Sequence, residues 1–227
     1  MSNGTKVKKR DGRSESLNLE KMHRMVEEAT KGLAGVSASQ VEIQSGIQFY
    51  DGITTAEIQE ILIRSASDLI DLDHPNYQFV AARLLLFSIR KSLYGRSRDM
   101  PLLEDHIVTC VNKEVYDADI YTKYSKEDIE KANGYIDHNR DFLFTYAGLR
   151  QVVDKYLVQD RSTNEVYETP QFMYMMIALT IFAEYPKQTR LNYVRRYYDA
   201  ISRHRINIPT PIMAGVRTPI RQFASCV

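Results

Sequence analysis

The sequence predicts a mainly α-helical protein that also carries two small β-hairpins. Apolar residues recur at helical spacing along most of the 227 residues, and Asp-Gly at positions 11 and 12 lies between two short extended runs. Hydrophobic residues make up 44% of the chain and charged residues 26%. This balance is typical of a globular protein, and it excludes a disordered tail or a collagen-like fibre.

The charge balance excludes a protein that holds nucleic acid or an anionic membrane through its overall field. Thirty Lys and Arg residues against 29 Asp and Glu residues give a net charge of +1, so any anion must be bound locally. The longest apolar stretches, residues 80–89 and 172–182, are interrupted by polar side chains and are too short to span a bilayer. Residues 1–10 lack the apolar core of a signal peptide. We therefore expect a cytoplasmic protein with no membrane partner and no direct nucleic-acid binding.

Residues 1–95 are predicted to form a first domain of one hairpin and four helices. The hairpin pairs residues 6–9 with residues 14–17. The first helix is predicted to begin at the capping residue Asn18, and the second at Ser37 or Ser39. The third begins in the capping box Thr54-Thr55-Ala56-Glu57, and the fourth is expected over roughly Asn76 to Tyr94. The second helix is expected to end near Tyr50. The polar segment 95–101, with its Gly and Pro, is a predicted linker.

Residues 96–220 are predicted to form a second, helical domain. Helices are expected over residues 101–113, 125–135, 140–154, 169–184 and 187–204, and a second hairpin over residues 156–168. Three prolines and a glycine exclude a continuous helix over residues 206–220. Residues 221–227 are predicted to begin a strand, so we expect further polypeptide to complete the fold.

Basic residues of the first domain can converge on a polyphosphate. Ammonium groups neutralise phosphate oxygens, and the helix start at Thr55 adds N–H donors and the positive end of a dipole. On composition alone, we favour a solvated surface and a plain helix cap, because both are more common than a phosphate site. No Walker motif and no GxGxxG occurs, which excludes a P-loop ATPase and a Rossmann dehydrogenase. The cations in question are Lys8, Lys9, Arg10, Lys21 and Lys91.

The histidines and cysteines do not predict a metal site. The five histidines show no HxxxH or HExxH spacing, and two cysteines are too few for a four-cysteine zinc site or a disulfide framework. Cys110, at an apolar helical position, is expected in the core. Cys226 taken alone suits a small buried strand residue. The tyrosine-rich segments 167–174 and 193–198 are expected to serve packing.

Several motifs, in the correct order, resemble the large subunit of class I ribonucleotide reductases. The ATP-cone of those subunits is matched by KRDG at residues 9–12, NLEK at 18–21, FYDGITT at 49–55 and YQFVAAR at 77–83. Residues 156–158, 167–172 and 208–219 resemble the helical region of the same subunit, and residues 221–227 resemble the first strand of its catalytic barrel. The resemblance implies a mainly α fold in which an ATP-cone precedes a helical domain and the first strand of an incomplete α/β barrel.

The resemblance also implies an allosteric site in residues 1–95, where ATP activates the reductase and dATP inhibits it. The phosphates would be met by Lys9, Arg10, Lys21 and Lys91. The base and sugar would be lined by Glu15, Ser16, Leu17 and Asn18, and Thr55 would donate a hydrogen bond from its helix start. The family commonly has a His one turn after that Thr, where this chain has Gln59. An amide can hydrogen-bond but cannot carry charge, so the resemblance supports nucleotide binding more strongly than dATP inhibition.

In the second half the resemblance implies a redox role for Cys226, as one half of the dithiol that reduces ribonucleoside diphosphates to deoxyribonucleoside diphosphates. Thioredoxin or glutaredoxin would reopen the resulting disulfide by exchange. Thr210 and Ser225 would contact the substrate diphosphate and ribose. The chain would need a downstream portion of the large subunit and a small subunit carrying a di-iron tyrosyl radical, within an oligomer, and would hold no cofactor of its own beyond its ATP or dATP effector.

The sequence leaves two questions open. A naturally split subunit and a truncated piece both explain a chain that stops after Cys226-Val227, and we favour the split subunit. A nucleotide-sensing regulatory or scaffold protein without catalysis is the alternative function. Its zinc-ribbon form is disfavoured because two distant cysteines cannot supply the ligands.

Overall fold

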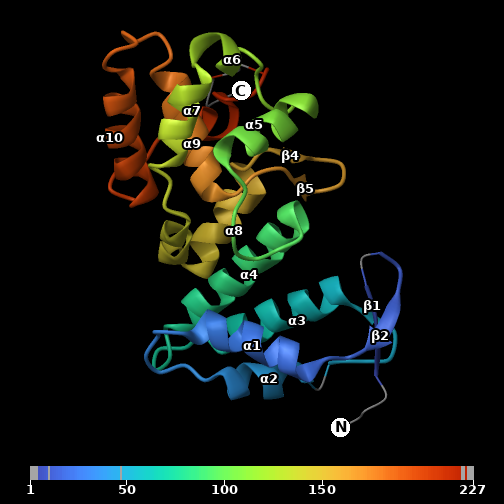
Figure 1. Ribbon diagram of the computed structural model, residues 1–227. Helices are drawn as coiled ribbons and strands as arrows, with labels where there is room; N and C mark the ends of the chain where they lie inside the picture. Colours follow the sequence, from blue (N-terminus) through green and yellow to red (C-terminus); the bar gives the residue numbers. More distant parts are fainter. Residues whose placement is uncertain (1–4, 10, 47, 221–222, 224–227) are drawn as a thin grey trace. The chain divides into compact units, whose positions relative to one another are not determined.

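The computed structural model describes residues 5–9, 11–46, 48–220 and 223, which are mainly helical (Figure 1). The chain forms two compact units, unit 1 from residues 1–88 with 144–150 and unit 2 from residues 89–143 with 151–227. The division falls inside helix α4 (Tyr77–Tyr94). The predicted domain boundaries at residues 95 and 220 stay predictions. Among the described residues, no helix is both long and apolar enough to cross a bilayer.

The sheet of unit 1 confirms the first hairpin and adds a strand that was not predicted. Strand β1 (Lys6–Lys8) pairs antiparallel with β2 (Ser14–Ser16) around a turn in which Gly12 has φ +84°. Strand β3 (Ile53–Thr54) pairs parallel with β1 on its other edge, giving the order β2-β1-β3. Two residues are too few to show the alternation by which a strand is found in a sequence.

The helices of unit 1 begin where the capping residues predict. Helix α1 (Leu19–Thr30) follows Asn18, α2 (Ala38–Gly46) follows Ser37, α3 (Thr55–Asp68) follows Thr54, and α4 begins one residue after Asn76. Helix α2 ends at Gly46 rather than near Tyr50. A glycine disfavours helix continuation because it loses the most backbone freedom. The core of this unit includes Val26, Leu62, Ile63, Val80 and Leu84, all buried.

Unit 2 contains the remaining elements, except that the start of α8 belongs to unit 1. They are α5 (Leu103–Asn112), α6 (Ile120–Lys123), α7 (Lys126–Asn133), the 3₁₀ helix η1 (His138–Leu143), α8 (Tyr146–Lys155), β4 (Gln159–Asp160), β5 (Glu165–Val166), α9 (Pro170–Ile181), α10 (Arg190–Ser202) and α11 (Thr210–Gly215). The second hairpin is confirmed with shorter strands.

Three features of this second half differ from the sequence prediction. The helix expected over residues 140–154 is divided into η1 and α8, because Thr145 Oγ1 accepts the Gly148 N–H at 3.2 Å and starts a new helix. The short helices α6 and α11 were not predicted; α11 fits between Pro209 and Pro219 with Pro211 in its first turn, where proline is tolerated. The strand predicted over residues 221–227 lies outside the described residues, apart from Phe223, which belongs to no regular element.

Helix α9 forms the centre of unit 2. Every residue from Pro170 to Leu179 is buried, so the helix is covered on all of its faces. Helix α10 packs beside it (Figure 1). Cys110 is buried as predicted, and burial raises the pKa of its thiol to about 12, which keeps it protonated and unreactive at neutral pH.

His106 lies in the same core as a neutral side chain. Its ring stacks on Phe172 with centroids 4.2 Å apart, and its Nε2 lies 3.1 Å from the Tyr116 hydroxyl. Burial lowers the pKa of His106 to about 4, because the imidazolium would lose its hydration. Burial has the same effect on the pKa of His138, also about 4.

We predict that acid destabilises unit 2 through His106. Its pKa in the folded chain lies below the unfolded value of about 6.5, so the folded state binds fewer protons between these values and the free energy of unfolding falls as the pH drops through this window. The full effect of such a shift is on the order of 3 kcal/mol. We expect His106→Gln to give a shallower loss of Tm between pH 7 and 4.5, measured by circular dichroism.

The exposed Leu72 provides the control, since Leu72→Gln changes no titratable group and should leave the pH profile of the parent unchanged. An identical profile for His106→Gln and the parent chain would contradict the assignment of His106 as a buried neutral group.

Candidate functional site

The sheet of unit 1 brings two of the predicted phosphate-binding residues to neighbouring positions. In the parallel pairing of β1 with β3, Lys8 lies opposite Thr54. Parallel strands continue in the same direction, so Lys9 and Thr55 leave the sheet at the same end. The backbone at Lys9 and the first turn of α3 therefore lie at the same end of the sheet.

A capping box fixes the start of α3. Thr54 Oγ1 accepts the Glu57 N–H at 3.1 Å, and Glu57 Oε2 accepts the Thr54 N–H at 2.8 Å. The Tyr50 hydroxyl donates to the other oxygen of Glu57 at 2.8 Å. These contacts lower the pKa of Glu57, the side-chain hydrogen bond from Thr54 most of all. The box uses the N–H of Glu57 and does not involve Thr55. Thr55 is the first residue of α3, in the turn where backbone N–H groups point along the helix dipole.

The hairpin places Lys9 against Glu15. The Lys9 Nζ lies 3.0 Å from Glu15 Oε2, and both side chains are partly exposed. The hydrogen bond from Lys9 lowers the pKa of Glu15. Two residues predicted to share a nucleotide site therefore contact each other directly, and an incoming phosphate would compete with Glu15 for the lysine.

Residues 15–18 lead from β2 into α1 as one continuous segment. The Leu17 N–H donates to the Thr5 carbonyl at 2.9 Å, and Asn18 Oδ1 accepts the Lys21 N–H at 2.8 Å as the helix cap. Ser16, Asn18 and Lys21 are exposed, and Leu17 is half-buried. The segment can line a ligand with exposed side chains, although the Asn18 oxygen already serves the cap.

Two further residues of the predicted allosteric site, and the departure from the family at Gln59, have different outcomes. Arg10 lies outside the described residues. Lys91 lies in the last turn of α4, in unit 2, so its place beside Lys9 stays a prediction. Gln59 is buried, and its Nε2 donates to the Leu84 carbonyl at 3.1 Å. The Gln59 amide thus joins α3 to α4.

In unit 2, Thr210 is the first residue of α11 and lines a cavity of about 800 Å³. Most of its lining comes from two stretches of the chain, residues 156–161 and 210–220. Gln159, Arg161 and Thr218 add polar groups to a largely apolar surface. The predicted partners of Thr210 in the substrate site, Ser225 and Cys226, lie outside the described residues, so their roles stay predictions.

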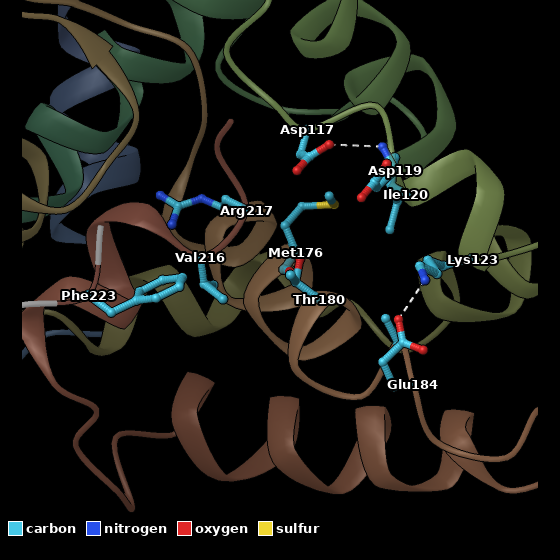
Figure 2. Close-up of a pocket in the computed structure, with 11 residues that line it drawn as sticks. Asp117, Asp119, Ile120, Lys123, Met176, Thr180, Glu184, Val216, Arg217 and Phe223 are labelled. Carbon is cyan, nitrogen blue, oxygen red and sulfur yellow. Dashed lines mark hydrogen bonds and ion pairs between the residues drawn. The ribbon is translucent and has the colours of Figure 1, made fainter. Parts of the chain in front are cut away.

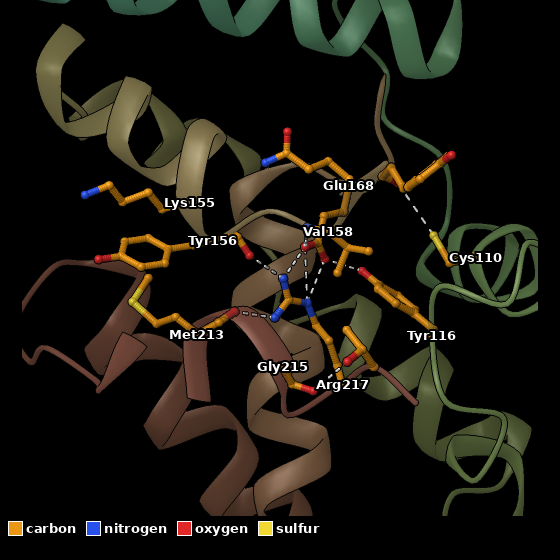
Figure 3. Close-up of polar contacts among 12 residues, drawn as sticks. Cys110, Tyr116, Lys155, Tyr156, Val158, Glu168, Met213, Gly215 and Arg217 are labelled. Carbon is orange, nitrogen blue, oxygen red and sulfur yellow. Dashed lines mark hydrogen bonds and ion pairs between the residues drawn. The ribbon is translucent and has the colours of Figure 1, made fainter. Parts of the chain in front are cut away.

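A buried ion pair that was not predicted from the sequence lies near this cavity (Figure 3). Glu168 and Arg217 are both fully buried, and Arg217 Nε donates to Glu168 Oε2 at 2.9 Å. The carboxylate also accepts the Val158 N–H at 2.6 Å and the Tyr116 hydroxyl. Both charged residues lie in motifs that carried the family resemblance, and each is the charged member of an otherwise uncharged motif. A single charged residue in each of two otherwise uncharged motifs was the sequence pattern from which this ion pair could have been predicted.

A second cavity of about 300 Å³ lies in the same unit (Figure 2). Asp117, Met176 and Phe223 line it, together with Lys123 and Glu184, which form an ion pair. Its described lining contains none of the predicted site residues. Among the residues that the structure describes, no group of three or more His, Cys, Asp or Glu side chains could hold a metal ion.

Comparison with known protein families agrees with both halves of the resemblance. Residues 5–92 match the ATP cone domain, and residues 142–221 match the all-alpha domain of ribonucleotide reductase. The first match covers the hairpin, β3 and the Thr55 helix start, and the second covers Glu168, Thr210 and Arg217.

Similar proteins are alpha subunits of ribonucleoside-diphosphate reductases. The chain is 51% identical to the subunit from Haemophilus influenzae and 50% identical to that of reductase 1 from Escherichia coli, each over all 227 residues. The subunit from Enterobacteria phage T4 is 43% identical over 97% of this chain. The chain spans about 30% of the length of these relatives.

Substitution of two adjacent threonines, Thr54 and Thr55, distinguishes the helix cap from the predicted ligand contact. We predict that Thr54→Ala lowers the free energy of unfolding by about 1 kcal/mol, since it removes the side-chain cap of α3. Thr55→Ala should leave stability within about 0.5 kcal/mol of the parent, because Thr55 lies outside the capping box. Urea unfolding of both variants measures the difference. Equal loss of stability in the two variants would contradict this division.

Proposed function

This chain belongs to the family of ribonucleoside-diphosphate reductase alpha subunits, and we propose that it provides two functions of such a subunit. Its first part binds ATP or dATP as an allosteric signal. Its second part contributes to the binding and reduction of ribonucleoside diphosphates. Since the chain spans about 30% of its relatives, the complete reaction would require the remaining portion of an alpha subunit.

The parallel pairing of Lys8 with Thr54 is the observation that carries the nucleotide proposal. In this proposal Lys9, which follows β1, meets the phosphates at the N-terminal turn of α3, where N–H groups and the helix dipole favour negative charge. The lysine is held by a partly exposed ion pair with Glu15, and ion pairs at the surface contribute only about 0–1 kcal/mol. Exchange of Glu15 for a phosphate oxygen would therefore cost little.

The proposed effectors are ATP and dATP, which differ only at the ribose 2′ position. The segment 15–18 is the proposed base and sugar contact, with Lys21 and Lys91 as further phosphate ligands. The Gln59 side chain is buried in a hydrogen bond to the Leu84 carbonyl. We therefore expect discrimination between ATP and dATP to depend on residues 15–18 more than on Gln59.

For the reduction, we propose that Cys226 is one of two thiols that supply the electrons. Replacement of the ribose 2′-hydroxyl by hydrogen releases water and needs two electrons and two protons. Two thiols provide both when they become a disulfide, and an external dithiol protein such as thioredoxin or glutaredoxin reopens it by exchange. The second thiol would come from the remaining portion of the alpha subunit. Thr210 and Ser225 are the proposed contacts to the substrate diphosphate and ribose.

The proposed partners follow from this division of the chemistry. A small subunit with a di-iron tyrosyl radical would start the reaction, and no resident cofactor is assigned to this chain. A nucleotide-sensing scaffold without catalysis would bind ATP equally well, so only the reduction assay separates the two functions.

We predict that Lys9→Ala and Lys91→Ala each weaken ATP binding roughly tenfold, because each removes one charge-assisted contact to a phosphate. Isothermal titration calorimetry with Mg-ATP measures the affinity. Lys31→Ala, at the end of α1 and outside the predicted site, is the matched control and should bind ATP like the parent. Unchanged affinity in Lys9→Ala would count against the nucleotide site.

We predict that Cys226→Ser abolishes ribonucleoside-diphosphate reduction, because a hydroxyl cannot form a disulfide. The assay combines the purified chain with the remaining portion of an alpha subunit, the small subunit and a dithiol reductant. Cys110→Ser, at the buried cysteine, is the control and should retain activity if it folds. Full turnover by Cys226→Ser, or no turnover with the parent chain, would favour the scaffold alternative.

A further inference from the structure

Arg217 connects the two stretches that line the Thr210 cavity. Its Nη2 donates to the carbonyl of Tyr156 at 2.9 Å, in the first stretch, and its Nη1 donates to the carbonyl of Met213 in α11, in the second (Figure 3). Both contacts are made to backbone carbonyl groups and not to side chains that line the cavity. A single guanidinium group thus holds the backbone of both stretches.

Glu168 extends this connection to the core. It accepts the N–H of Val158, which lines the cavity, and the Nε of Arg217. Glu168 lies two residues before α9, the helix that is buried on all faces, and Tyr116 donates a further hydrogen bond to it. The ion pair is therefore anchored next to the buried helix of unit 2, as suits a positioning group.

We propose that Glu168 and Arg217 are positioning residues that set the separation of residues 156–161 from residues 210–220, and thereby the place of Thr210 in the cavity. Neither side chain lines the cavity, so both act through the backbone. This inference rests on the proposed function, because it takes the cavity as part of the substrate diphosphate site.

The chemistry of the two side chains explains why this pair suits the role. A guanidinium group is planar and offers five N–H donors in a fixed fork, so it serves a carboxylate and two carbonyls at once. A lysine keeps the charge but offers one nitrogen, which cannot reach the same acceptors. A glutamine at position 168 keeps the shape of Glu168 but loses the charge.

The first test measures kcat and KM for a ribonucleoside diphosphate in the reconstituted reductase that contains this chain. We expect Arg217→Lys and Glu168→Gln each to raise KM roughly tenfold, with a smaller change in kcat, since the diphosphate contact is displaced. The matched control is Arg190→Lys, which alters another buried arginine; it pairs with Asp128 at 2.6 Å, and neither residue lines the cavity. Its KM should equal that of the parent.

The second test measures amide hydrogen exchange on the 227-residue chain without substrate. We expect Arg217→Lys and Glu168→Gln to speed exchange at Val158 and in α11 roughly tenfold, while Arg190→Lys leaves both regions unchanged. This readout does not depend on catalysis. If one of the two variants does not fold, the other provides the same comparison.

The two tests separate failure of this inference from failure of the proposed function. If Thr210→Val leaves KM unchanged, the cavity is not the diphosphate site and the proposed substrate role is wrong. If Thr210→Val raises KM while Glu168→Gln and Arg217→Lys match the Arg190→Lys control in KM and exchange, the ion pair is merely structural and the positioning role is overturned.

Discussion

The buried pair of Glu168 and Arg217 is the contact on which the second half of the structure depends. Removal of two charges from water is costly, and their mutual attraction offsets that cost only when the remaining donors and acceptors are also satisfied. Here the guanidinium group reaches the carbonyls of Tyr156 and Met213, while the carboxylate accepts from Val158 and Tyr116. Loss of either charge would leave the other uncompensated, at a cost of about 3–5 kcal/mol. The pair therefore ties four segments into one arrangement.

The same principle explains how α9 acquires a defined orientation. An apolar helix that is buried all round has no amphipathic face to direct it, so its rotation must be fixed by directional contacts. Gln171 provides them, since its Nε2 donates to Asp141 at 2.9 Å and its Oε1 accepts the Tyr198 hydroxyl at 2.7 Å. Asp141 in turn accepts from Arg90 at 2.8 Å. Burial raises the pKa of Asp141, while Arg90 opposes that shift.

Unit 1 relies on weaker and more exposed polar contacts. Its helices begin at local caps, and its charged hairpin residues pair in solvent-exposed positions such as Lys9 with Glu15. Exposed pairs hold their partners loosely, so they can be exchanged at little cost in free energy. This contrast with unit 2 agrees with the proposed functions: a nucleotide sensor would need contacts that can be replaced, and a substrate site would need contacts that hold their positions.

Local structure could be predicted from the sequence, because it depends on residues within about one turn of each other. The Asp11-Gly12 hairpin, the Asn18 cap and the Thr54–Glu57 capping box are of this kind. Pairings between distant residues were decided only by the tertiary structure. Strand β3 lies beside β1, and Arg217 reaches Glu168 across 49 positions, because burial in a shared core outweighs the entropy of closing long loops. No local pattern in a sequence records that balance.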